Sequence, residues 1–380
     1  MILDISDSTF KNVLNDKSLY LPIRWNGSDF ASTLDNLLNH YINQIESLSN
    51  ENSNHYNLIN VNVKDIKRVC GLLLRTVNHY LNGFPSKAYS SLERVMGLLM
   101  DKPLKIYQKS VMEQFEVHRG HYKKDDDLKL FRVVSVEDNK PYSRARVFHT
   151  PYNLRSKVST SRYSIAGYPS LYLGTTLALC CEEIHMNPHQ NFTLASMFKL
   201  ERTLEYTNTN IRVIELGVKP QDFLNIEYDN ESHESHERRI SNSLLNDSSI
   251  RSAYLLWYPL IASCSYIRTN KNDPFAAEYI IPQLLMQWVR NEISSNKDDE
   301  YDQLVGIRYF SCASVKASDM GFNYVFPTSG QQKSAELPYC SVLSKSFRLT
   351  NPVYIHEYDD LHICECRLTR ANDFDFIGSL

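Results

Sequence analysis

The stretch SRYSIAGYPSLYLGTTLALCCEE, residues 161–183, decides the fold of the second half of this chain. Residues 162–164 and 171–173 favour strands, in which successive side chains point to opposite faces of a sheet. Gly174 ends the second of these strands, and Thr175 or Thr176 is suited to cap a following helix. The stretch therefore predicts a strand that leads through a tight turn into a helix.

Three polar side chains of this stretch are expected to meet at one cleft. Because the leucines on either side of Tyr172 point into the core, its ring points the other way and can meet Arg162. Glu182 and Glu183 differ by about 100° around a helix, so only one of them faces the cleft, and the spacing from Tyr172 favours Glu183. An arginine, a tyrosine and a glutamate around one strand-to-helix turn indicate a nucleotide site.

Length and composition narrow the class of protein. The 380 residues, of which 42% are hydrophobic, suffice for two buried cores, so two domains are expected. A net charge of −3 without a long Lys/Arg run argues against nucleic acid as a direct ligand. The first residues lack the pattern of a secretion signal, and no long apolar run suits a membrane span. We therefore expect a cytoplasmic protein whose eight cysteines are reduced packing residues.

The first third of the chain has the periodicity of helices. Apolar residues recur at three-and-four spacing in the segments 32–48, 65–81 and 85–99. Ser32 with Asp35 has the form of a capping box, and Asn82-Gly83 suits a C-terminal cap. We predict a helical N-terminal domain over residues 1–122, with a regulatory or assembly role that includes homo-oligomerisation as an option. The charged run 123–127 is the expected boundary.

Beyond this boundary the pattern changes to that of strands. Short β-prone runs occur at 130–134, around Arg162 and Tyr172, and at 211–216, 279–281 and 309–311. Residues 283–289 favour a helix packed on the sheet. Residues 225–249 are rich in Asn, Ser, Glu and His and are expected to form a polar surface insertion. We therefore predict an α+β domain over residues 128–380.

Several segments of this second domain resemble the RES domain, a toxin family named after its arginine, glutamate and serine. They are LFRVV at 130–134, FHTPYNLR at 148–155, RYSIAGYPSLYL at 162–173, Glu183, and GIRYFSCAS at 306–314 followed by NYVF at 323–326. Their order and spacing agree with the family over roughly residues 130–326. The chain departs from shorter relatives by its N-terminal helices, the insertion 225–249 and the tail after residue 330.

The resemblance implies an ADP-ribosyltransferase-like fold that acts on NAD. Carried over by position, the catalytic residues would be Arg162, Tyr172, Glu183 and Ser311. Further candidates for contact with the substrate are Arg132, His149, Ser164, Gly167 and Asn323, for which packing or turn roles are equally open. NAD would be a substrate rather than a bound cofactor, and inorganic phosphate is an option as co-substrate. A cognate antitoxin or other regulatory protein is implied by the family alone.

The chemistry of NAD explains why these residue types are needed. Cleavage of the nicotinamide–ribose bond by water (an NAD glycohydrolase) or by phosphate (an NAD phosphorylase) builds oxocarbenium charge on the ribose. Glu183 beside a ribose hydroxyl would stabilise that charge. Arg162 can bind pyrophosphate or an acceptor phosphate, and Tyr172 offers its ring to nicotinamide or ribose. Ser311 could donate to phosphate, although Cys312 and Ser314 compete for that position.

The sequence is therefore interpreted as an NAD-consuming toxin or defence effector, with two alternatives. A protein ADP-ribosyltransferase can use the same arginine, tyrosine and glutamate. A noncatalytic nucleotide-binding interaction protein would bind NAD without turnover. No metal site is predicted: residues 233–236 are one residue short of the zinc motif HExxH and lie in a polar loop. His362, Cys364 and Cys366 alternate along an expected strand without an evident fourth ligand.

Overall fold

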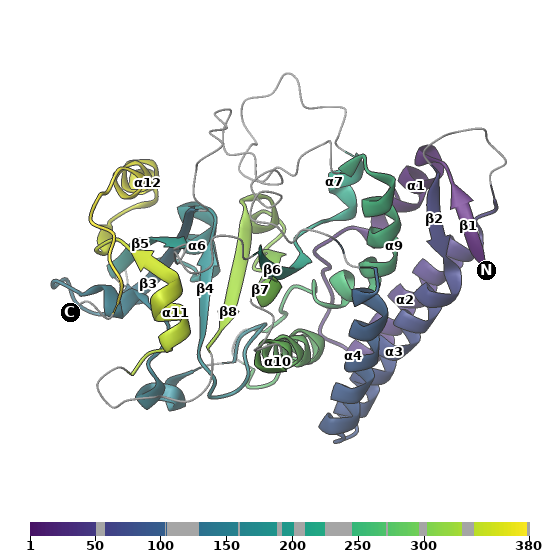
Figure 1. Cartoon of the computed structure of the whole chain (residues 1–380), viewed down its shortest axis with the longest axis horizontal. Helices are drawn as coiled ribbons and strands as arrows, with labels where there is room; N and C mark the ends of the chain where they lie inside the picture. The colour runs from purple at the N-terminus through teal and green to yellow at the C-terminus, as the bar shows by residue number, and fades with distance from the viewer. Residues whose placement is uncertain are drawn as a thin grey trace.

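The chain folds into N-terminal helices followed by a mixed eight-stranded sheet with interspersed helices (Figure 1). This computed structural model describes residues 1–50, 58–102, 104, 129–158, 160–187, 192–200, 210–224, 245–270, 273–295, 302–328 and 338–377. The predicted α+β class, with helices preceding a sheet, is confirmed.

The N-terminal part consists of helices and one small sheet. Its elements are β1 (Ile2–Ile5), α1 (Asp7–Leu14), α2 (Phe30–Glu46), β2 (Ile59–Asn62), α3 (Val63–Leu81) and α4 (Pro85–Met100). Strands β1 and β2 pair antiparallel and were not predicted. Helices α2, α3 and α4 match the three predicted segments, because apolar residues at three-and-four spacing are buried along one face of each helix.

The caps of these helices agree only in part with the prediction. Asp29 caps α2 by accepting a hydrogen bond from the backbone N–H of Ala31 at 3.1 Å. Ser32 lies inside the helix and donates its hydroxyl to Asp29, so the predicted capping box at Ser32 was wrong. After α3, Gly83 has a φ of +81°, a conformation that favours glycine and ends the helix as predicted.

The residues after 128 form one mixed sheet. Its strands are β3 (Lys129–Val136), β4 (Ser170–Gly174), β5 (Phe192–Leu200), β6 (Asn210–Leu216), β7 (Asp302–Phe310), β8 (Phe322–Pro327), β9 (Phe347–Leu349) and β10 (Val353–Ile355). The strand order is β10-β5-β3-β4-β8-β7-β6, and β9 also pairs with β5. Strands β6 and β7 run parallel, because the connection between them contains helices, whereas the other described pairs are antiparallel. Strand β4 thus lies at the centre of the sheet.

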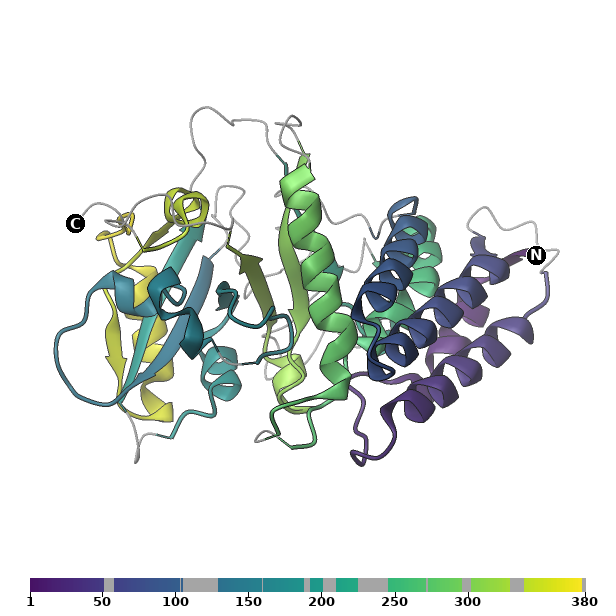
Figure 2. The same cartoon turned by 90° about the horizontal axis from the view of Figure 1, so that it is seen from below.

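The helices that follow residue 128 are α6 (Leu177–Glu183), α7 (Pro220–Leu224), α9 (Ser248–Ser263), α10 (Ile280–Ser295), α11 (Ser341–Ser346) and α12 (Leu361–Thr369). Two of them, α9 and α10, join the sheet to the N-terminal part. Helix α10 contacts β7 as well as α3 and α4, and α9 contacts α3 and β2 (Figures 1 and 2). None of the helices in the described part of the chain has the length and apolar character of a membrane span.

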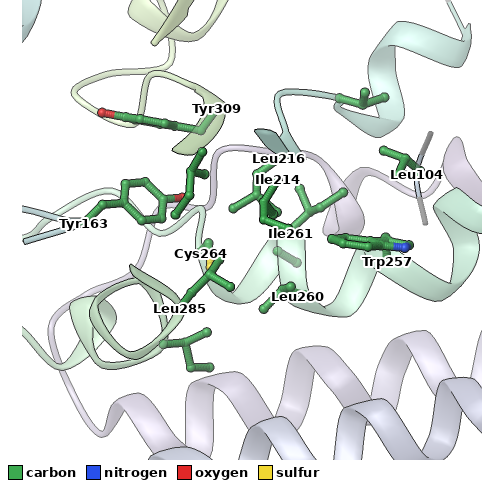
Figure 3. Close-up of a cluster of buried hydrophobic side chains, with 14 of the residues drawn as sticks. Leu104, Tyr163, Ile214, Leu216, Trp257, Leu260, Ile261, Cys264, Leu285 and Tyr309 are labelled. Carbon is green, nitrogen blue, oxygen red and sulfur yellow. The ribbon is translucent and has the colours of Figure 1, made fainter. Parts of the chain in front are cut away.

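One buried apolar cluster runs from the N-terminal helices to the sheet. Figure 3 shows a part of this cluster, in which Trp257, Leu260 and Ile261 of α9 lie near Ile214 and Leu216 of β6. Helix α9 is buried along almost its whole length, because it contacts α3 and β2 of the N-terminal part and also lies near Ile214 and Leu216 of β6 (Figure 3). The apolar core is therefore continuous across the two parts.

Hydrogen bonds cross the same contact between α9 and the N-terminal part. The hydroxyl of Tyr41 donates to the carbonyl of Leu255 at 2.7 Å, and that of Tyr258 donates to the carbonyl of Leu19 at 2.9 Å. The predicted division into residues 1–122 and 128–380 stays a prediction. Its expected boundary at 123–127 lies outside the described residues, as does most of the insertion expected at 225–249.

Two segments predicted as strands are helical. Tyr279 ends a 3-10 turn (Ala277–Tyr279) and residues 280 and 281 begin α10, because a short apolar run fits a buried helix as well as a strand. His362, Cys364 and Cys366 lie on α12, where residues four apart share a face: Sγ of Cys366 is 3.9 Å from Nδ1 of His362. All eight cysteines are free thiols; six of them are buried, as expected of packing residues, whereas Cys364 and Cys366 on α12 are half-buried.

Candidate active site

Strand β4 and helix α6 carry two of the predicted site residues. The leucines that flank Tyr172 are buried, and Tyr172 is half-buried on the opposite face of β4. Thr176 caps α6 by accepting a hydrogen bond from the backbone N–H of Leu179 at 3.2 Å. Glu183 is the last residue of α6 and lies about two turns after this cap. The predicted order of strand, turn and helix is confirmed.

Arg162 lies in a turn, so the strand expected around it was wrong. The Ser164 hydroxyl accepts from the backbone N–H of Ser161 at 2.7 Å and donates to its carbonyl at 2.9 Å, and such local bonds replace a strand ladder. The turn directs Arg162 inward, where its side chain is 8% exposed. Its Nη1 donates to the carbonyl of Cys264 at 2.9 Å, and its Nη2 donates to the carbonyl of Tyr266 at 2.7 Å.

Tyr172 is fixed at both its hydroxyl and its backbone. The hydroxyl lies 2.7 Å from Oγ of Ser161, and the carbonyl accepts from Nη1 of Arg132 at 2.9 Å. Burial raises the pKa of Tyr172 well above its usual value, so the phenol is neutral at physiological pH. Burial lowers the pKa of Arg132 to about 10, which still leaves the guanidinium charged at neutral pH. The buried Nε of Arg132 has no hydrogen-bond partner among the described residues.

Glu183 is oriented by Asn323 of β8. Strand β8 pairs with β4 so that Asn323 lies opposite Gly174, at the end of β4 from which α6 follows. The Nδ2 of Asn323 donates to Oε1 of Glu183 at 2.5 Å. This hydrogen bond holds the carboxylate at the cavity wall, while the side chain of Glu183 stays exposed to solvent. The predicted contact of Asn323 with a substrate stays a prediction.

A cavity of about 480 Å³ brings most of these residues together. Its lining includes six of the nine predicted site residues, namely Arg132, Arg162, Ser164, Tyr172, Glu183 and Asn323. The volume lies within the range of roughly 300–1,000 Å³ that is typical of ligand pockets. Arg162, Tyr172 and Glu183 therefore share one pocket, as the sequence predicted.

The cavity carries a local excess of positive charge. Its lining holds four cationic side chains, those of Arg132, Lys157, Arg162 and Arg268, and one carboxylate, that of Glu183. The chain as a whole has a net charge of −3, so this concentration of cations is a property of the site. An anionic ligand, such as a molecule with phosphate groups, suits such a cavity.

Several lining residues had no role in the sequence prediction. They are Lys157, Ser161, Arg268, Tyr279 and Tyr309. The ring centroid of Tyr279 lies 4.9 Å from the guanidinium of Arg162 and 5.3 Å from that of Arg268, so one ring contacts two cations. Arg268 and Tyr279 reach the cavity through the tertiary fold, and no sequence motif marks them.

Tyr309 and Cys312 come from the GIRYFSCAS segment. The ring centroids of Tyr309 and Tyr163 are 4.6 Å apart, and Figure 3 shows both rings at one side of the apolar cluster that contains Cys264. Burial raises the pKa of the Cys312 thiol, so the thiol is protonated at neutral pH and is not a thiolate nucleophile. The signal for Tyr309 in the sequence is its position in the same segment as Ser311, two residues earlier.

Three predicted residues do not line the described cavity. Ser311 follows the end of β7, is fully buried, and accepts a hydrogen bond from the backbone N–H of Ala313 at 3.1 Å. Gly167 has a φ of +69° and allows the tight turn that ends at Tyr168. His149 is buried, with Nδ1 2.8 Å from the carbonyl of Thr150. The structure gives these residues packing or turn contacts and does not bring them to Arg162.

We expect His149 to make the free energy of unfolding decrease at acid pH. Burial, aided by the charge of Arg132, lowers the pKa of His149 to about 4, whereas an unfolded histidine titrates near 6.5. Between these values the unfolded chain binds a proton that the folded chain does not bind. Stability is therefore lost as the pH falls from about 6.5 to about 4, by a total of about 3 kcal/mol. Urea unfolding at pH 7 and pH 4.5 measures this loss.

The matched variant is His149→Gln. Nε2 of His149 accepts a hydrogen bond from the backbone N–H of Cys340 at 2.9 Å, and the glutamine carbonyl oxygen can replace this acceptor without titrating. The two proteins share the same carboxylates, so the difference in how their free energies of unfolding depend on pH is the contribution of His149. Equal pH dependence of the two proteins would contradict the assignment.

Among known proteins, the chain is similar to a protein of Bacillus subtilis. It is 27% identical over 342 residues to the protein named "Putative toxin YopC" of Bacillus subtilis (strain 168). The aligned region covers 88% of this chain and 68% of that protein. The chain is thus a distant homologue of YopC. No family model and no solved structure matches the chain. The likeness to the RES domain therefore rests on the sequence motifs described above.

Proposed function

We propose that this chain is an NAD-consuming toxin that cleaves the bond between nicotinamide and ribose in the cavity beside β4 and α6. The observation that carries the proposal is the convergence of Arg162, Tyr172 and Glu183 on one cationic cavity of about 480 Å³. The proposal includes the ADP-ribosyltransferase-like character of the fold. Distant homology to a protein named as a toxin supports the cellular role.

The positive charge of the cavity supports a dinucleotide as the ligand. The pyrophosphate of NAD carries two negative charges, and arginine binds phosphate oxygens through paired N–H groups. The guanidinium groups of Arg162 and Arg268 both contact the ring of Tyr279, and Arg132 keeps a buried donor without a protein partner among the described residues. We assign these arginines to the pyrophosphate.

Glu183 supports cleavage of the N-glycosidic bond. When the C1′–N bond breaks, the electron pair leaves with nicotinamide, which becomes neutral, and positive charge develops on the ribose. The carboxylate of Glu183, fixed by Asn323, stabilises this charge through a ribose hydroxyl. Water or phosphate then forms the new bond to C1′ and releases a proton. Because nicotinamide leaves as a neutral molecule, no general acid is required.

The test is to incubate the purified chain with NAD, with and without inorganic phosphate, and to identify the products by mass spectrometry. We expect free nicotinamide together with ADP-ribose, or with ADP-ribose 1″-phosphate when phosphate is the acceptor. ADP-ribose attached to a protein would identify a protein ADP-ribosyltransferase instead. The enzymatic function would be rejected if the purified chain bound NAD saturably but formed no product, and if cells that express the chain formed none either. That result would favour a nucleotide-binding interaction protein.

A further inference from the structure

The active-site arginine is held by the backbone that follows α9. Cys264 is the C-cap of α9, and the carbonyls of Cys264 and Tyr266 accept one hydrogen bond each from the guanidinium of Arg162, at 2.9 and 2.7 Å. We call these two carbonyls the carbonyl clamp. Carbonyls at the C-terminal end of a helix carry partial negative charge, so they bind a cation favourably. Two fixed N–H groups leave the planar guanidinium a single orientation.

The opposite edge of the same segment is held by the N-terminal part of the chain. The backbone N–H of Ile23 donates to the carbonyl of Ser265 at 2.9 Å, and the N–H of Ile267 donates to the carbonyl of Ile23 at 2.9 Å. Ile23 and Tyr266 thus form a parallel bridge. Successive backbone groups of an extended segment point to opposite edges. One edge therefore binds Arg162 and the other binds Ile23.

Side chains from the N-terminal part also fix the clamp. The buried ring of Tyr266 has edge-to-face contacts with Phe30 and Trp25, at centroid distances of 5.1 and 6.3 Å. The segment that contains Ile23 is in turn anchored to α7, because the side-chain amide of Gln221 donates to the carbonyl of Leu21 at 2.8 Å. The contacts run without a break from the N-terminal helices to Arg162.

We propose that the segment 21–30 positions Arg162 for nucleotide binding by fixing the carbonyl clamp. Ile23 and Phe30 are then positioning residues, which touch Arg162 only through Tyr266 and its neighbours. The N-terminal part is built into the site, so NAD affinity depends on its packing against Tyr266. This inference rests on the proposed function of the cavity. Its physical basis is that a displacement of about 1 Å at a charged ligand contact can lower a rate or an affinity by up to about 100-fold.

The first test compares two buried phenylalanines of the N-terminal part. Phe30→Leu weakens the contact with Tyr266, whereas Phe10→Leu weakens a contact of similar geometry with Phe223 of α7, at a centroid distance of 5.1 Å, and removes neither the described ring contacts of Tyr266 nor the hydrogen bond of Gln221 with Leu21. We expect Phe30→Leu to raise the KM for NAD about tenfold or more with kcat within about threefold, because Arg162 contributes binding common to ground and transition state. Phe10→Leu should leave both constants unchanged. Equal effects of the two variants on KM, including no effect of either, would overturn the proposal.

The second test does not depend on NAD turnover. Arg162→Lys keeps a positive charge but cannot span both carbonyls of the clamp, so its thermal unfolding is measured alone and together with Phe30→Leu. If Phe30 acts through the clamp, the double variant should lose about 1–3 °C less in Tm than the two single losses together. Additive losses would overturn the positioning role even if NAD is cleaved. If the losses in Tm are non-additive but the protein does not cleave NAD, the result contradicts the proposed function and leaves the positioning role supported. If Phe30→Leu does not fold, Trp25→Phe tests the same contact.

Discussion

Replacing Glu183 with glutamine is expected to lower kcat for NAD cleavage by about 10- to 150-fold or more. Glutamine keeps the size of the side chain and can still bond to Asn323, but it removes the negative charge that stabilises the developing oxocarbenium ion. Loss of one charge-assisted hydrogen bond corresponds to about 1.5–3 kcal/mol, which gives this range of rates. Release of nicotinamide under saturating NAD measures the effect.

Glu182→Gln is the matched control for this experiment. Glu182 is the neighbour of Glu183 on α6, points about 100° away around the helix, and is not among the lining residues described for the cavity. The same change of charge at this position should leave kcat within about twofold. Similar losses at both positions would indicate a general electrostatic or folding effect and would contradict the role assigned to Glu183.

Replacing Glu215 with glutamine is expected to reduce the free energy of unfolding by about 3–5 kcal/mol. Glu215 of β6 lies opposite Arg308 of β7, and both side chains are fully buried, with Oε2 of Glu215 2.7 Å from Nη1 of Arg308. The guanidinium also lies 3.7 Å from the ring centroid of Phe322. The substitution removes the negative charge of Glu215 from beside a buried cation, and breaking one side of a buried ion pair is strongly destabilising. Urea unfolding at pH 7 measures the loss.

The exposed pair of Glu46 and Lys67 supplies the control. Its Nζ–Oε1 distance is 2.8 Å, close to that of the buried pair, but both side chains are more than two-fifths exposed. Glu46→Gln should therefore reduce stability by about 0–1 kcal/mol. If the buried and exposed substitutions cost the same, the buried pair has no special role. Replacing both Glu215 and Arg308 with apolar residues should recover much of the stability lost in Glu215→Gln.

The sequence predicted best the elements whose structure is decided by near neighbours. Helices α2, α3 and α4 follow from apolar periodicity, and β4, Gly174 and α6 follow from a short stretch with its own cap. Residues 279–281 were misassigned, because a short apolar run does not distinguish a strand from a buried helix. The turn at Arg162 was missed, because it depends on the hydrogen bonds of one serine with its third neighbour.

The site residues that the sequence could place correctly are those that lie close together along the chain. Tyr172 and Glu183 are separated by one turn and one short helix, so their spacing alone placed them at one cleft. Arg268 and Tyr279 reach the cavity from beyond α9, through packing that no local pattern encodes. Ser311 was expected on a strand, but β7 ends one residue earlier and the hydroxyl turns to the backbone of Ala313.

The late position of α9 in the chain has a consequence for synthesis on the ribosome. Tyr258 and Leu19, which are bonded in the folded protein, are 239 residues apart. At roughly 5–20 residues per second, a nascent chain that has emerged through Glu183 waits roughly 4–16 s for the backbone of Cys264 and Tyr266. During that interval Arg162 has no carbonyls to hold it. The site proposed for NAD therefore cannot hold Arg162 in place before translation has passed Tyr266.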